Sequence, residues 1–207
     1  MRTYEFGNPK ASVVLIEPIH TVEGMENEAG IIRELAGGDF LLRAVSVDWF
    51  RDLSPWTAPP VFGNTAFGNG ARETLEKILD LTGETGKQYV LGGYSMGGLF
   101  ALWAAYQTGV FAGVAAVSPS VWFPGFPDYA KAHTLQTGRI YLSLGDREEK
   151  TKNPVMASVG DRIRELHGYF RDQGVPSCLE WNKGNHFMDP DRRTAKGFAW
   201  VLKGIKA

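Results

Sequence analysis

The sequence has very little cysteine and no cluster of residues that typically binds a metal. Its one cysteine, Cys178, has no partner for an internal disulfide. Because such a chain suits a reducing compartment, we expect a cytoplasmic protein. No group of cysteines and histidines has the spacing of a structural zinc site. We therefore expect neither a metal nor another cofactor.

Long hydrophobic runs and an excess of charge of either sign are also missing. No apolar stretch approaches the roughly 20 residues that span a membrane, and residues 1–18 lack the apolar core and cleavage site of a secretory leader. The 22 lysines and arginines balance 23 aspartates and glutamates, so no overall field attracts nucleic acid or anionic lipid. We expect neither as a partner.

The sequence does contain apolar runs that alternate with amphipathic helical patterns, which is typical of an α/β domain. Its 207 residues, 43% of them hydrophobic, are enough for one domain over 1–207 with a substantial core. The runs that we expect to be strands are 12–17, 41–47, 88–94, 113–118, 139–145 and 177–181. Their continuous apolar character indicates a mainly parallel sheet with helices on both faces. The helical patterns are 26–36, 71–79, 97–108, 154–170 and 192–203, and Asn153 is a good N-cap for the fourth.

Two segments rich in proline, glycine and aromatic residues interrupt this scheme. Residues 48–70 and 119–133 are too long for bare connections, so we expect structured surface loops. Both follow strands at what should be the same edge of the sheet, where long loops often carry function. Trp49 and Trp122 are our candidates for substrate contact, although packing of the loops onto the body explains such aromatics equally well.

One serine lies among glycines where a predicted strand turns into a predicted helix. Gly93-Tyr94-Ser95-Met96-Gly97 fits the pattern G-x-S-x-G. Strand, motif and helix in this order are typical of a nucleophile elbow, whose small residues relieve crowding at a tight turn. The context predicts that Ser95 is a nucleophile.

A serine hydroxyl needs a base, and His186 is in the best position to supply one. It lies in a polar loop after the last predicted strand, where this chain order of serine, acid and histidine requires it. His20 and His133 lie too early, and His167 lies inside a predicted helix, where a packed or solvated side chain is the simpler interpretation.

The acid that orients this histidine should follow the preceding strand. The turn there offers Asp146, Glu148 and Glu149, and a carboxylate would hold the imidazole tautomer and stabilise its charge. The alternative is a solvated charge cluster with Arg147 and Lys150. We favour Glu148, with Asp146 as second choice.

Four motifs, GGYSMGG, VSPSVWF, SLGDREE and GNHF, follow one another in the order seen in α/β-hydrolase esterases. From its first strand onward, the sequence resembles the branch that includes enterochelin (siderophore) esterases and esterase D-like enzymes. The resemblance implies an α/β-hydrolase fold with six to seven strands, compact and without a cap domain. It also implies that the acid comes three positions after the glycine that closes the penultimate strand, which maps onto Gly145 and Glu148.

The sequence departs from that pattern where the oxyanion hole should form. Many relatives have His-Gly-Gly-type residues after the first long strand, whereas this chain reads IEPIHTVEG. Pro18 has no N–H to donate, which leaves Ile19, or else His20, as the second donor beside the Met96 amide. We also expect no strand before residue 12.

Together these features predict a serine hydrolase that cleaves a small carboxylic ester through an acyl-enzyme. Two alternatives stay open. An acyltransferase or peptidase-like enzyme could use the same triad with another acceptor or bond. A catalytically silent α/β-hydrolase-fold protein could bind a ligand or partner instead.

Overall fold

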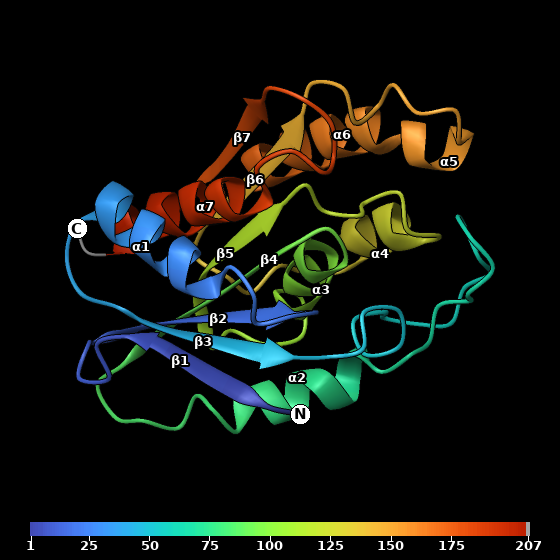
Figure 1. Ribbon diagram of the computed structural model, residues 1–207. Coiled ribbons are helices and arrows are strands. Elements are labelled where there is room, and N and C mark those ends of the chain that lie inside the picture. Colours follow the sequence, from blue (N-terminus) through green and yellow to red (C-terminus); the bar gives the residue numbers. More distant parts are fainter. Residues whose placement is uncertain (206–207) are drawn as a thin grey trace.

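The computed structural model describes residues 1–205 and builds them around one sheet of seven strands (Figure 1). The strands are β1 Thr3–Gly7, β2 Val13–Ile19, β3 Leu41–Ser46, β4 Gln88–Tyr94, β5 Phe111–Val117, β6 Ile140–Gly145 and β7 Ser177–Asn182. Their order across the sheet is β1-β3-β2-β4-β5-β6-β7. β1 runs antiparallel to β3, and the other six strands are mutually parallel. The mainly parallel sheet and its strand number agree with the sequence prediction.

β1 is the strand that the sequence prediction missed, so the expectation of no strand before residue 12 is wrong. Its five residues alternate between exposed and half-buried positions at the edge of the sheet. Tyr4 and Phe6 pack against the core, whereas Thr3 and Glu5 are exposed. Such a short alternating segment has none of the continuous apolar character that marks the central strands.

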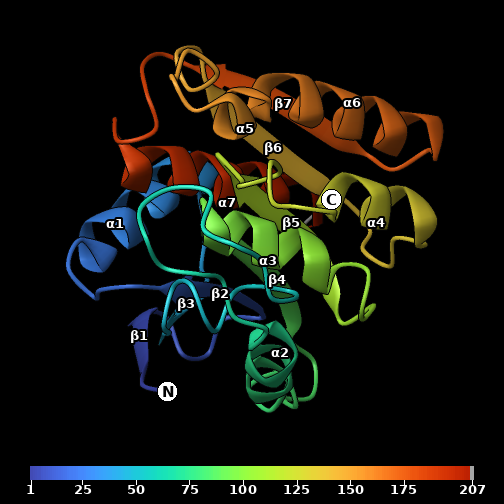
Figure 2. The same ribbon diagram turned by 90° about the vertical axis from the view of Figure 1, so that its right-hand side faces the viewer.

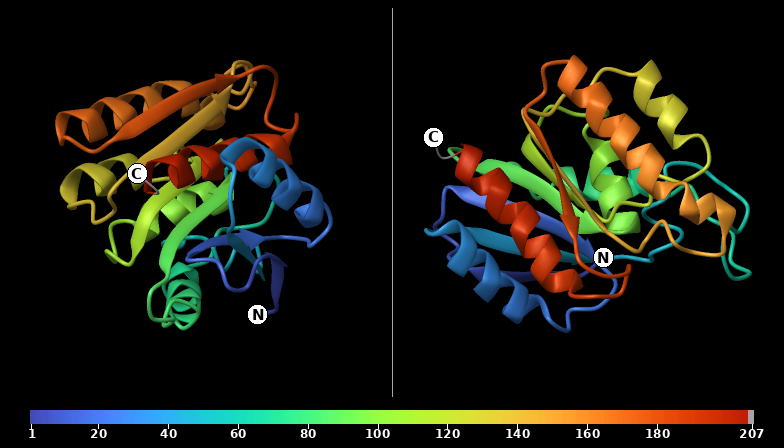
Figure 3. Two further views of the ribbon diagram at one scale, coloured as in Figure 1. Left: turned by 90° about the vertical axis from the view of Figure 1, so that its left-hand side faces the viewer. Right: turned by 90° about the horizontal axis from the view of Figure 1, so that it is seen from above.

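Helices cover both faces of the sheet (Figure 2). They are α1 Met25–Ala36, α2 Ala71–Leu79, α3 Met96–Ala104, α4 Phe126–Ala132, α5 Pro154–Ala157, α6 Val159–Asp172 and α7 Pro190–Ile205. α1 and α7 lie side by side on one face (Figure 3), and α2, α3 and α6 pack on the other. Within residues 1–205 no cap domain is added to these layers, and no helix there is both long and apolar enough to cross a bilayer.

The buried strand β2 shows why the central strands read as apolar runs. Val13 and Leu15 belong to the core on the α1 and α7 side, while Val14 and Ile16 belong to the core on the α2 and α3 side. Because successive side chains point to opposite faces, a strand covered on both sides has apolar residues at most positions, and the buried Glu17 is the exception in β2.

Two helical segments differ from the sequence prediction. The expected helix over 154–170 is broken at Ser158 into α5 and α6, although its cap is confirmed: the Asn153 side chain accepts hydrogen bonds from the amides of Val155 and Met156. The segment 119–133, expected to be a loop, contains α4. The prolines and aromatic residues of this segment obscured the regular spacing of apolar residues that predicts a helix.

Candidate active site

Ser95 lies at the sharp turn between β4 and α3, at the carboxyl edge of the parallel strands. Its backbone has φ 55° and ψ −116°, a conformation that costs free energy for a residue with a side chain. The Ser95 amide donates a 3.0 Å hydrogen bond to the Val117 carbonyl of β5. A Cβ atom at Gly93 would lie 2.7 Å from the carbonyl carbon of Gly97, so the turn closes only around a glycine.

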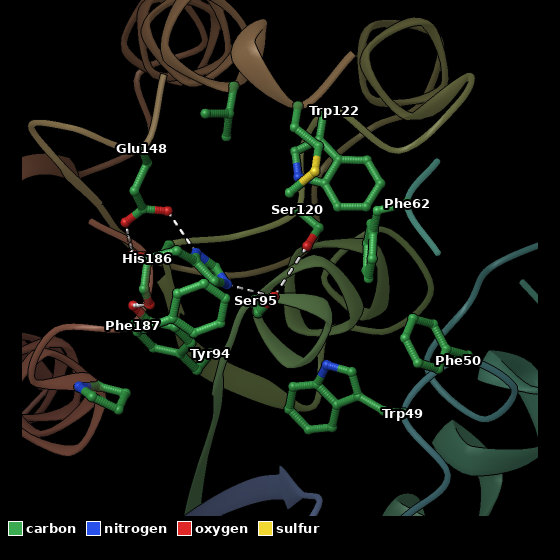
Figure 4. Close-up of a pocket in the computed structure, with 14 residues that line it drawn as sticks. Trp49, Phe50, Phe62, Tyr94, Ser95, Ser120, Trp122, Glu148, His186 and Phe187 are labelled. Atoms are coloured by element: carbon green, nitrogen blue, oxygen red, sulfur yellow. Dashed lines mark hydrogen bonds and ion pairs between the residues drawn. The ribbon is translucent and has the colours of Figure 1, made fainter. Parts of the chain in front are cut away.

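Three side chains from separate connections form a continuous chain of hydrogen bonds (Figure 4). The Nε2 atom of His186, from the loop after β7, is 3.0 Å from Ser95 Oγ. Its Nδ1 atom is 2.6 Å from Oε2 of Glu148, which lies in the turn after β6. His186 is 28% exposed and Glu148 only 4%, so the ring reaches the cavity while the carboxylate is shielded from water.

The second carboxylate oxygen of Glu148, Oε1, is held by three donors. Ser118 Oγ and the Gly145 amide each donate a 2.7 Å hydrogen bond, and Arg193 Nη1 donates one of 3.1 Å. Burial alone raises the pKa of Glu148, but hydrogen bonds and charge from His186, with the donors Ser118 and Gly145, outweigh it and lower that pKa below its usual value. Glu148 is therefore an anion beside the imidazole at neutral pH.

The other two carboxylates of the same turn point elsewhere. Asp146, our second choice from the sequence, accepts a 2.8 Å hydrogen bond from the Gly184 amide. It thereby braces the loop that carries His186. Glu149 pairs with Arg164 of α6 at 3.0 Å.

The sequence analysis missed Ser118, Ser120 and Arg193. Ser118 directly follows β5 and has φ 42°, and Ser120 Oγ lies 3.3 Å from Ser95 Oγ. Arg193 is 3% exposed and also contacts the Tyr94 hydroxyl and the Lys183 carbonyl. Two serines just after a buried strand could have indicated polar residues at the site. Arg193 gave no such indication, because it looks like any charged residue of an amphipathic helix.

The proposed oxyanion donors lie where β2 and α3 approach each other. Met96 begins α3, where the first amides of a helix have no partner within the helix and favour negative charge. Ile19 ends β2, and its carbonyl accepts a hydrogen bond from Val47. His20 is exposed and stands edge-on to Trp49. Both donors stay predictions.

A cavity of about 490 Å³ opens beside Ser95. Trp49 and Trp122 both line it, as does Phe62. Other aromatic residues of the two long segments pack those segments together: Trp56 donates to the Pro124 carbonyl, and Phe67 contacts Trp122 with the rings tilted by 57°. Within residues 1–205 no group of three or more potential ligands could hold a metal ion.

Solved structures identify the fold as that of the α/β-hydrolases. Siderophore hydrolase EstB from Aspergillus nidulans superposes with a TM-score of 0.73 at 18% identity, over 97% of this chain and 86% of its own. An IroE-like serine hydrolase from Shewanella oneidensis gives 0.68 at 16%, over 94% and 70%. FphF, a fluorophosphonate-binding serine hydrolase from Staphylococcus aureus, gives 0.63 at 12%, over 97% and 98%.

The family follows from the sequence itself. The model of the Esterase family, described as "Putative esterase", matches residues 58–189, which is more than half of the chain. No curated protein matches the chain. The chain belongs to the Esterase family, and this membership places it among esterase-type hydrolases.

Proposed function

We propose that the protein is a serine esterase in which Ser95 is the nucleophile, His186 the base and Glu148 the orienting acid. The observation that carries this proposal is the unbroken chain of contacts from Ser95 Oγ through the imidazole to the buried carboxylate, at 3.0 and 2.6 Å. This geometry lets the serine lose its proton as it attacks an ester carbonyl.

The reaction proceeds in two steps. Ser95 Oγ bonds to the carbonyl carbon while its proton moves to His186 Nε2, and the oxyanion that forms faces the Met96 amide, with Ile19 as second donor. His186 then gives its proton to the leaving alkoxide, and an acyl-enzyme results. Water attacks this ester with the same histidine as base, which returns Ser95 and releases the acid.

A single domain over 1–207 and a cytoplasmic location remain predictions.

The test is labelling and turnover with matched variants. Wild-type protein should react with a fluorophosphonate probe and hydrolyse p-nitrophenyl acetate, whereas Ser95→Ala should not label. His186→Ala should lower kcat by about 10³-fold or more. His133→Ala is the control, because this exposed histidine of α4's C-cap stacks on Tyr129 away from the site.

The alternatives have different outcomes in the same experiment. A silent binding protein neither labels nor exceeds the Ser95→Ala variant in hydrolysis, and that result would overturn the proposal. An acyltransferase labels normally but consumes the ester only when an alcohol or amine acceptor is added.

A further inference from the structure

The cavity beside Ser95 has two different sides (Figure 4). His186 and Phe187 lie on one side of the serine, and Phe62, Trp122 and Phe50 lie on the other. Phe187 is 87% exposed, so the histidine side opens to solvent. The opposite side is a wall built from the segment 48–70 and the residues that follow β5.

The proposed reaction decides which half of an ester occupies each side. His186 Nε2 must protonate the leaving oxygen, so the alcohol lies beside the imidazole. The acyl group then turns away from His186, toward the wall. The wall therefore selects the acyl group, while the alcohol projects toward the open side.

The wall is apolar and shaped by aromatic rings. Phe62 stands edge to face with Trp122, with ring centroids 5.9 Å apart, and Phe50 lies 5.7 Å from Phe62. Met156 and Val159 complete it from α5 and α6. Such a surface offers mainly dispersion contacts and ring edges, which favour an apolar or aromatic group.

Within residues 1–205 the lining of this cavity includes no lysine or arginine. Its one carboxylate is that of Glu148, which contacts the His186 imidazole. Arg193 lies behind Glu148, is 3% exposed and pairs with it. An anionic acyl group would lose its hydration here without gaining a positively charged partner.

We propose that the substrate is an uncharged ester whose acyl group is apolar. This inference rests on the proposed function, because it needs Ser95 and His186 to define the two sides. The proposed substrate distinguishes this chain from any esterase whose substrate carries a carboxylate or another anionic group on its acyl portion.

The test uses a matched pair of substrates with one leaving group. The enzyme should hydrolyse p-nitrophenyl 3-phenylpropanoate with kcat/KM about 100-fold above that for the analogue with a para-carboxylate on the ring. It should also prefer the phenylpropanoate to p-nitrophenyl acetate. Equal rates on the neutral and carboxylated esters would refute the proposal.

Charge placed in the wall should weaken the preference. Met156→Lys should raise kcat/KM for the carboxylated ester relative to the neutral one by about tenfold or more, because it supplies the missing countercharge. Met156→Gln, which is polar but uncharged, should leave the ratio near that of wild type. If the two variants change the ratio alike, the charge argument is wrong. Phe62→Lys repeats the test from the other segment, in case Met156→Lys does not fold.

Acetate separates failure of this inference from failure of the proposed function. Loss of fluorophosphonate labelling and of acetate hydrolysis in wild-type protein would reject the esterase itself. Normal labelling and acetate hydrolysis, with no preference for the neutral aryl ester, would reject only the substrate class.

Discussion

Glu148 holds its position through four donors, and this separates it from its neighbours in the same turn. His186 contacts one oxygen, and Ser118, Gly145 and Arg193 contact the other. The sequence alone left three carboxylates within four positions, since a side chain's direction in a turn depends on contacts from distant segments. The preference for Glu148 over Asp146 came from the spacing after Gly145 that the family resemblance implies.

Isosteric substitutions distinguish the two carboxylates. Glu148→Gln should lower kcat by about 10³- to 10⁴-fold, because an amide cannot stabilise the imidazolium. Asp146→Asn should keep activity within about tenfold, since its carboxylate contacts the Gly184 amide and not the ring. Steady-state kinetics on p-nitrophenyl acetate, with circular dichroism as a check on folding, measure both. An undiminished Glu148→Gln enzyme would remove Glu148 from the mechanism.

At the scale of the elements, Asn153 joins two parts of the cavity wall. The side-chain oxygen Oδ1 of Asn153 accepts the hydrogen bonds that cap α5. The side-chain nitrogen Nδ2 donates a 2.6 Å hydrogen bond to the Val61 carbonyl, next to Phe62. One side chain thus fixes both Met156 and Phe62. The sequence predicted the cap, but it held no sign of the second contact, which spans 92 positions.

Asn153→Asp should loosen the wall without removing the cap. The aspartate keeps the acceptor for the helix amides but has no N–H for Val61. We expect KM for p-nitrophenyl 3-phenylpropanoate to rise about five- to tenfold, while kcat on the acetate stays near wild type. Asn153→Ala, which loses both contacts, should also lower the free energy of unfolding by about 1 kcal/mol. A merely structural role would predict no shift in KM for the Asp variant.

The sequence predicted those elements whose burial leaves a pattern. Six strands and the elbow follow from apolar runs and from glycine spacing, because the central sheet is covered on both faces. The edge strand β1, the short helix α4 and the break at Ser158 left no such pattern. Likewise, Arg193 acts through tertiary contacts that no local spacing encodes.

At the scale of the whole molecule, two buried carboxyls connect the sheet to the layer of α1 and α7. Glu17 lies on β2 and Glu28 on α1, and both are at most 5% exposed. Burial raises the pKa of Glu17 to about 7. Burial and the nearby charges of Glu17 and Asp191 raise the pKa of Glu28 well above its usual value. The folded protein therefore retains protons that the unfolded chain releases near pH 4.5.

This retention should make the protein less stable as pH rises. Between about pH 4.5 and 7 the folded state binds more protons than the unfolded state, so the free energy of unfolding falls with pH. A carboxyl pKa raised from 4.5 to about 7 corresponds to a loss on the order of 3 kcal/mol. Urea unfolding of Glu17→Gln should show a weaker decline between pH 5 and 8 and higher stability than wild type at pH 8.

Glu26→Gln is the control for this measurement, because Glu26 is on the same helix as Glu28 but is exposed. It should follow the wild-type curve. If stability rises with pH in wild-type protein, or if Glu17→Gln declines as steeply as wild type, the buried carboxyls do not carry the effect.

The convergence of donors on Glu148 also has an evolutionary consequence. The residue ties together the ends of β5 and β6, the loop after β7 and helix α7. Its loss leaves Arg193 as an uncompensated buried cation, whereas loss of the Ser95 hydroxyl removes only its contacts with Ser120 and His186. We therefore expect descendants that abandon catalysis to lose the serine first and to keep the glutamate, so a retained acid is weak evidence of activity in this family.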